Sequence, residues 1–123
     1  MSATFRASAI DMGDGVATVS VVGEADLYTA PELKAALMSA IDGGARRVLV
    51  DLSETTFIDS TTLGVLMGGV RRLRTVGGEI AIVCRDPNIK KIFEITLLDR
   101  IFRIFGSFED GVAHLREQDA PSA

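Results

Sequence analysis

The chain has 123 residues, of which 47% are hydrophobic and 24% charged, and its formal net charge at pH 7 is -4. That length suits one domain with its own core, and the composition is that of an ordinary globular protein. The acidic balance, without a basic stripe joined to aromatic residues, argues against nucleic acid as a partner. No apolar run approaches the ~18 residues of a membrane span, and the first residues lack a signal peptide's apolar stretch, so we expect a cytoplasmic protein with no membrane contact.

The N-terminal part of the chain predicts a hairpin followed by a helix. Residues 4–10 and 16–22 read as two strands joined by a short glycine-containing connection. Thr29 lies three residues before Glu32, which predicts a capping box at a helix start, and Pro31 suits the first turn. Apolar residues then recur at helical spacing until an Asp-Gly-Gly segment ends the helix.

Strand and helix alternate through the rest of the chain. The expected strands are 46–52, 79–84 and 100–105, and the expected helices are 61–75, one from Pro87 after the N-cap Asp86, and one from the N-cap Ser107 to about Glu117. The order β-β-α-β-α-β-α-β-α predicts an α/β fold with a mixed, mostly parallel sheet and about four helices packed on it. We expect one domain over residues 1–117 and a disordered tail at 118–123.

Two acidic, hydroxyl-rich loops, 23–30 and 53–62, follow strands at the edge where ligands and partners of such sheets bind. Asp59 or Ser60 must begin the helix, because the apolar stripe starts directly after them and a side-chain oxygen there can cap it. A helix start also accepts an added phosphate, whose ~1.5 to 2 negative charges would alter a docking surface and leave the fold intact. The segment is therefore either a plain cap or the position of a binding switch.

Catalysis by this chain alone is not expected, and the sequence predicts neither a cofactor nor a metal site. The only histidine, His114, lies inside the last predicted helix as a surface or boundary residue, and no nucleophile elbow surrounds Ser60. Cys84 lies in an apolar run and is expected to be a buried, inert thiol. A phospho-aspartate receiver could use Asp51 as acceptor, and resemblance to receivers would require a metal-binding carboxylate cluster at the end of the first strand and a lysine. Here the first strand ends in the hairpin DMGDG, and the last strand is followed by GSFED, with no lysine.

Glycines inside the helix predicted at 61–75 need a reason, because each costs roughly 0.8 to 1 kcal/mol relative to alanine. Gly64 and Gly68 share a helix face with Ser60 and with the arginines at 71–72, whereas Gly69 does not. Close packing on a neighbouring element is one explanation. A bare face on which a partner can lie close is the other, and we favour it for Gly64 and Gly68.

The resemblance to a known family rests on the motifs GEADLYTAPELKAAL, VLVDLSETTFIDSTTLGVLMGG and GGEIAIVCRDPNIKKIFEITLLDRIFRIF. In this order they resemble the bacterial anti-sigma factor antagonists (anti-anti-sigma factors) of the STAS domain family. G-E-x-D and DST followed by LGVL are specific together. The resemblance implies partner switching in transcription regulation. The unphosphorylated protein binds an anti-sigma factor that is a GHKL-type serine kinase and frees a sigma factor, phosphorylation ends the binding, and a PP2C-type phosphatase reverses it.

Residue by residue, the resemblance implies Ser60 as the phosphorylation acceptor, directly after the motif aspartate. The implied partner-binding residues are Glu24, Asp26, Asp59, Thr61, Thr62, Gly64 and Gly68. Glu24 could instead be structural, and Thr62 stands where the family usually has glycine. The alternative function is a STAS module outside sigma regulation, in a signalling complex or in a lipid or anion transporter.

Overall fold

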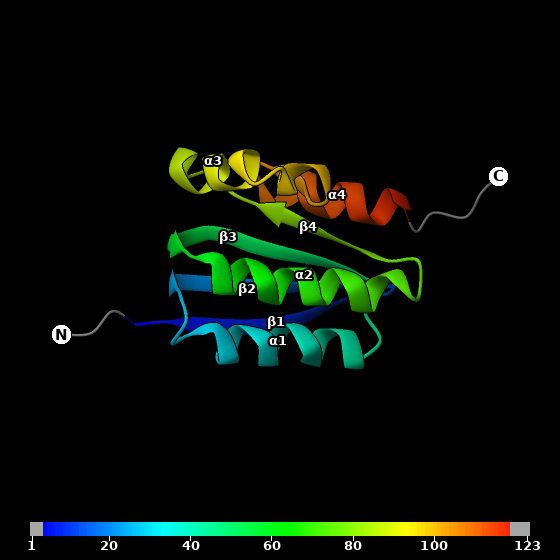
Figure 1. Cartoon of the computed structure of the whole chain (residues 1–123). Coiled ribbons are helices and arrows are strands. Elements are labelled where there is room, and N and C mark those ends of the chain that lie inside the picture. Colours follow the sequence, from blue (N-terminus) through cyan, green and yellow to red (C-terminus); the bar gives the residue numbers. More distant parts are fainter. Residues whose placement is uncertain (1–3, 119–123) are drawn as a thin grey trace.

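Five strands form one sheet in the computed structural model, which describes residues 4–118. The strands are β1 (Arg6–Gly13), β2 (Val16–Ala25), β3 (Arg47–Ile58), β4 (Glu79–Val83) and β5 (Arg103–Phe105). They lie in the order β1-β2-β3-β4-β5; β1 and β2 are antiparallel, and the other neighbours are parallel (Figure 1). The mixed, mostly parallel sheet is confirmed.

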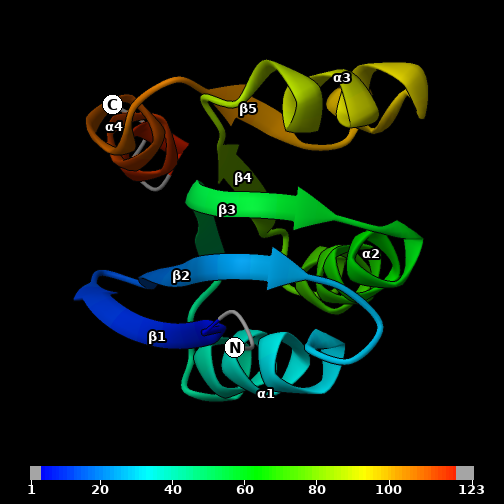
Figure 2. The same cartoon turned by 90° about the vertical axis from the view of Figure 1, so that its left-hand side faces the viewer.

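Four α-helices cover the sheet, as predicted. They are α1 (Ala30–Asp42), α2 (Ser60–Arg74), α3 (Pro87–Ile95) and α4 (Phe108–Gln118), with a short 3-10 helix, η1 (Leu98–Arg100), after α3. Helices α1, α2 and α3 pack on one face and share the larger core, whereas α4 lies on the other face (Figure 2). Residues 119–123, most of the predicted disordered tail, lie outside the described residues.

The hairpin and two of the predicted helix caps are confirmed in atomic detail. Asp14 and Gly15 turn the hairpin with φ of 58° and 78°, the left-handed pair that an Asp-Gly turn supplies. Asp86 accepts a hydrogen bond from the Asn88 N–H at 2.8 Å, and the Ser107 hydroxyl accepts one from the Asp110 N–H at 3.2 Å.

The predicted capping box at α1 is wrong. Thr29 is the N-cap residue, but it has helix-like angles (φ -96°, ψ -10°) and its side chain makes no cap hydrogen bond. Its hydroxyl instead donates to the Glu24 carbonyl oxygen at 2.9 Å. The Glu32 carboxylate, expected to reach back to the helix start, accepts from the Ala7 N–H of β1 at 3.1 Å. Tertiary partners have replaced the local ones.

Several element boundaries differ from the predictions: strands β1 and β2 each end three residues later than expected, and the boundaries of β3 and β5 differ as well. Strand β3 continues to Ile58 through much of the expected loop 53–62, because its residues keep pairing with β2 as far as the Ala25–Ile58 pair. The strand expected at 100–105 begins only at Arg103, because Leu97 adopts a left-handed conformation (φ 61°) and η1 follows it. The differences at β3 and β5 depend on contacts that no local sequence pattern encodes.

Candidate functional site

The two predicted loops meet at one edge of the sheet. Strands β2 and β3 are parallel and end on the register pair Ala25 and Ile58. The segment that follows β2, residues 26–29, therefore lies beside Asp59, which follows β3. One hydrogen bond joins the two segments directly, since the Leu27 N–H donates to Asp59 Oδ2 at 3.0 Å.

Asp59 is the N-cap of α2, one of the two residues predicted to begin this helix. Its Oδ1 accepts from the Thr62 N–H at 3.0 Å, while Oδ2 takes the bond from Leu27. Both carboxylate oxygens are thus used inside the protein, and the side chain is half-buried. Asp59 fixes the helix start and ties the neighbouring loop to it.

Asp26 shapes the loop between β2 and α1. Its Oδ1 accepts from the N–H groups of Tyr28 at 2.9 Å and Thr29 at 3.1 Å, and its carbonyl oxygen accepts from the Ala30 N–H at 2.8 Å. Such bonds from an aspartate to the backbone two and three residues later define a tight turn. The turn presents Leu27 and Tyr28 to solvent, with 61% and 88% of their surface exposed.

Thr62 does not belong to the exposed surface, contrary to its predicted partner contact. It is 0% exposed, and its hydroxyl donates to the Ala25 carbonyl oxygen at 2.7 Å. The reason is its place one turn after the N-cap, where the side chain points back toward the end of β2. A glycine at this position could not make that bond, so the threonine adds a link between helix and sheet.

Ser60 is the first residue of α2 and is exposed. Within residues 4–118 its hydroxyl makes no hydrogen bond, so a modifying enzyme would break no internal contact to reach it. The amide groups of the first helical turn give this end of α2 partial positive charge. The side chain is therefore accessible in a setting that accommodates an anion.

Sequence reasoning missed three apolar side chains in these two segments. Leu27 and Tyr28 flank the hydrogen bond to Asp59, and Phe57, which is 47% exposed, precedes Asp59 by two residues. Exposed Tyr and Phe side chains are enriched where proteins bind one another. The signal available in the sequence was the pair of apolar residues inside the otherwise polar segment 23–30.

The glycines of α2 divide into two kinds. A Cβ on Gly69 would lie 2.7 Å from Leu37 Cδ2 and 2.9 Å from Ile80 Cδ1, so this glycine permits close packing of α2 on α1 and β4. A Cβ on Gly64 would meet nothing within 4 Å, and one on Gly68 would approach only the Arg71 guanidinium, at 3.9 Å. Packing inside the domain therefore explains Gly69 and leaves Gly64 and Gly68 unexplained.

Other reactive side chains lie away from this edge. His114 Nε2 is 3.1 Å from Glu79 Oε1, and Glu79 begins β4 at the opposite edge of the sheet. Cys84 is buried as predicted, and burial raises the pKa of its thiol. Among residues 4–118 no group of three or more His, Cys, Asp or Glu side chains could hold a metal ion.

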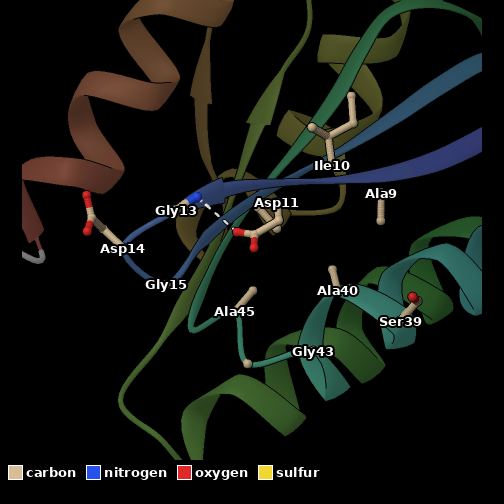
Figure 3. A pocket seen from close by; sticks show the side chains of 12 residues that line it. Ala9, Ile10, Asp11, Gly13, Asp14, Gly15, Ser39, Ala40, Gly43 and Ala45 are labelled. Atoms are coloured by element: carbon tan, nitrogen blue, oxygen red, sulfur yellow. Dashed lines mark hydrogen bonds between the residues drawn. The ribbon is translucent and has the colours of Figure 1, made fainter.

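A shallow pocket of about 320 Å³ lies at that opposite edge, between the β1–β2 hairpin and the end of α1 (Figure 3). Small side chains and glycines line much of it, and Asp11 Oδ1 accepts there from the Gly13 N–H at 2.9 Å. None of the predicted site residues lines this pocket. Across the described part of the chain, every helix is too short or too polar to cross a bilayer.

The structure is that of a small α/β binding domain. It has an accessible serine at a helix start, beside two loops that are fastened together and carry exposed aromatic residues. Residues 9–111 match the model of the STAS domain. The anti-sigma-B factor antagonist of Staphylococcus aureus is 35% identical over 86 residues, which cover 70% of this chain and 80% of that protein. The chain belongs to the STAS domain family, among its anti-sigma factor antagonists.

Solved structures show the same architecture. An anti-sigma factor antagonist from Mycobacterium paratuberculosis superimposes with a TM-score of 0.82 at 29% identity, over 92% of this chain and 95% of that one. SpoIIAA in its unphosphorylated form superimposes with a TM-score of 0.71 at 18% identity, over 94% of this chain and 98% of that one. The second similarity is one of fold. The recognised family and the predicted fold class are confirmed.

Proposed function

We propose that this protein is a partner-switching antagonist whose unphosphorylated form binds an anti-sigma factor and thereby releases a sigma factor. In the proposed cycle the anti-sigma factor is a GHKL-type serine kinase that phosphorylates Ser60, and a PP2C-type phosphatase restores the binding form. The whole cycle would run in the cytoplasm, where the kinase has ATP. The observation that carries the proposal is the exposed Ser60 at the start of α2, beside a loop held by Asp59.

The switch would act through charge with little change of shape. A phosphate on Ser60 adds ~1.5 to 2 negative charges. The N-terminal amides of α2 favour an anion, so the helix would stay folded. Glu24, Asp26 and Asp59 already make this edge of the sheet acidic. A partner suited to the unmodified surface would have to desolvate an additional charged phosphate at a position where it otherwise meets a neutral hydroxyl.

The proposed contact surface surrounds Ser60. It consists of Glu24, Asp26, Asp59, Thr61, Gly64 and Gly68 from the sequence-based set, without Thr62, together with Leu27, Tyr28 and Phe57. Tyr28, the most exposed of the three apolar side chains, has the features of an anchor residue, since tyrosines are enriched among the few interface residues that contribute most of the binding energy. Asp26 and Asp59 would act mainly by holding this surface in shape, because their oxygens already accept internal hydrogen bonds.

The test is phosphorylation by serine-kinase anti-sigma factors encoded in the same genome. We expect one phosphate, located at Ser60 by mass spectrometry after incubation with Mg-ATP. Ser60→Ala should remove the label with little loss of stability, because the cap belongs to Asp59. Labelling of Thr61 in the Ser60→Ala variant would contradict the assignment. Capture of transporter subunits from native cells, with no kinase, would favour a STAS module outside sigma regulation.

A further inference from the structure

A groove of about 670 Å³ runs along the outer surface between α1 and α2, the two helices that lie side by side in Figure 1. Its lining is largely apolar, with Met38 of α1 and Val65 of α2. It reaches from Thr61, next to Ser60, to Thr75 at the end of α2. At 1.5 Å per residue this is about 20 Å of helix.

Cationic side chains line the groove although the chain as a whole is acidic. Lys34 of α1 and Arg71 and Arg72 of α2 all contribute to it, whereas the net charge of the chain is -4. Arg72 forms an ion pair with Asp42, at 2.6 Å. Lys34 and Arg71 are exposed and have no carboxylate partner within the described chain. The groove therefore offers two unneutralised cations above an apolar floor.

We propose that this groove binds one amphipathic, acidic helix of the anti-sigma factor, an inference that rests on the proposed function. Charge complementarity selects the occupant. Its apolar face would cover Met38 and Val65, and its carboxylates would pair with Lys34 and Arg71. The length of the groove fits a helix of about four turns, or roughly 14 residues.

The shape of the groove favours a helix over an extended peptide. Two adjacent parallel helices leave a furrow of the width that a third helix fills, and Gly64 and Gly68 remove the side chains that would otherwise hold the third helix away. An extended peptide that binds by strand addition would need a strand edge with free backbone groups, which neither helix supplies, and the groove lacks the aromatic lining that polyproline peptides use. Gly64 and Gly68, left unexplained by packing inside the domain, thereby gain a reason.

A purely local account of the arginines exists, since cations near the end of a helix interact favourably with its dipole. Arg71, Arg72 and Arg74 all lie in the last turn of α2. That account does not extend to Lys34, which belongs to the other helix and faces the same groove. It also predicts a loss of stability on charge reversal, with no specific loss of binding.

The deciding experiment measures binding of the kinase that phosphorylates Ser60, by calorimetry, to the wild type and to Lys34→Glu/Arg71→Glu. The matched control is Lys91→Glu/Arg100→Glu, which makes the same charge change at exposed positions outside the groove. We expect about a 30-fold loss of affinity in the groove variant and about 3-fold or less in the control. The salt dependence between about 0.05 M and about 0.5 M NaCl should be shallower in the groove variant. Thermal unfolding of both variants checks that the domain is folded.

A shape variant and a readout on the kinase complete the test. Gly68→Leu should leave the domain as stable as the wild type or more so, and should weaken binding by at least the same order as the groove charge variant. In hydrogen exchange, the kinase segment protected by the wild type should be helical and acidic. The groove assignment would be overturned if the groove and control variants had equal affinity, or if the protected kinase segment were basic or non-helical. The proposed function would survive that result if Ser60→Asp still weakened binding. Absence of any wild-type binding would overturn both the groove and the proposed function.

Discussion

Removing the Asp59 carboxylate should cost stability in two separable parts. Asp59→Ala deletes the N-cap bond to the Thr62 N–H, a loss of about 1 kcal/mol. It also deletes the bond from the Leu27 N–H, which water can partly replace because Leu27 is exposed, so this part is about 0.5 kcal/mol. The sum of about 1.5 kcal/mol corresponds to a fall of roughly 5 °C in Tm for a domain of this size.

Asp59→Asn separates the two parts. The asparagine oxygen can still cap α2, but its NH₂ group cannot accept from the Leu27 N–H, so a loss of only about 0.5 kcal/mol is expected. Urea denaturation followed by circular dichroism measures both variants against the wild type. Equal losses in the two variants, or a change below about 0.5 kcal/mol for alanine, would refute the double role of this carboxylate.

Three further outcomes are expected. Ser60→Asp should keep the native circular dichroism spectrum, because a carboxylate suits a helix start, and should bind the anti-sigma partner much more weakly; equal affinity would remove the electrostatic basis of the switch. Gly69→Ala should destabilise the domain by about 1 to 3 kcal/mol, because the added Cβ collides with Leu37. Gly64→Ala should instead stabilise the domain by up to about 1 kcal/mol, and the denaturation midpoints of the two variants measure the difference. Burial raises the folded-state pKa of Cys84, so the folded protein keeps this thiol protonated at pH values where the unfolded chain ionises it, and its contribution to stability is full below the unfolded pKa and lost as pH rises through the folded pKa. Labelling of Cys84 by a thiol reagent in mildly alkaline buffer should therefore be slow until urea is added. Fast labelling of the native protein would contradict this expectation.

Local signals in the sequence were sufficient for the helix starts. Asp86, Ser107 and the Asp59–Ser60 pair each stand directly before an apolar stripe, and a cap acts on backbone groups two or three residues away. The alternation of strands and helices was equally readable, and it determined the mixed sheet. These three helix starts could be predicted from neighbours within a few residues, whereas the local Thr29–Glu32 pattern failed because Glu32 bonds to Ala7 of β1 instead.

Features that depend on distant partners could not be predicted from the sequence. The hydroxyl of Thr62 is buried because the carbonyl group of Ala25, 37 residues earlier, lies within 2.7 Å of it. The polar second half of β3 is strand because β2 continues alongside it. The loop that exposes Leu27 and Tyr28 is fastened to Asp59, 32 residues later, through the Leu27 N–H. In each case the side chain's type was visible in the sequence and its direction was not.

The carboxylate of Glu32 has a consequence beyond helix α1. Strand β1 is the outermost strand on its side of the sheet, and an outermost strand offers free N–H groups to any other extended chain. Glu32 occupies one of them, at Ala7, and sets a negative charge beside it. Addition of a foreign strand at such an edge leads to aggregates. The acidic side chain on α1 thus blocks one of the donors through which another strand could pair with β1.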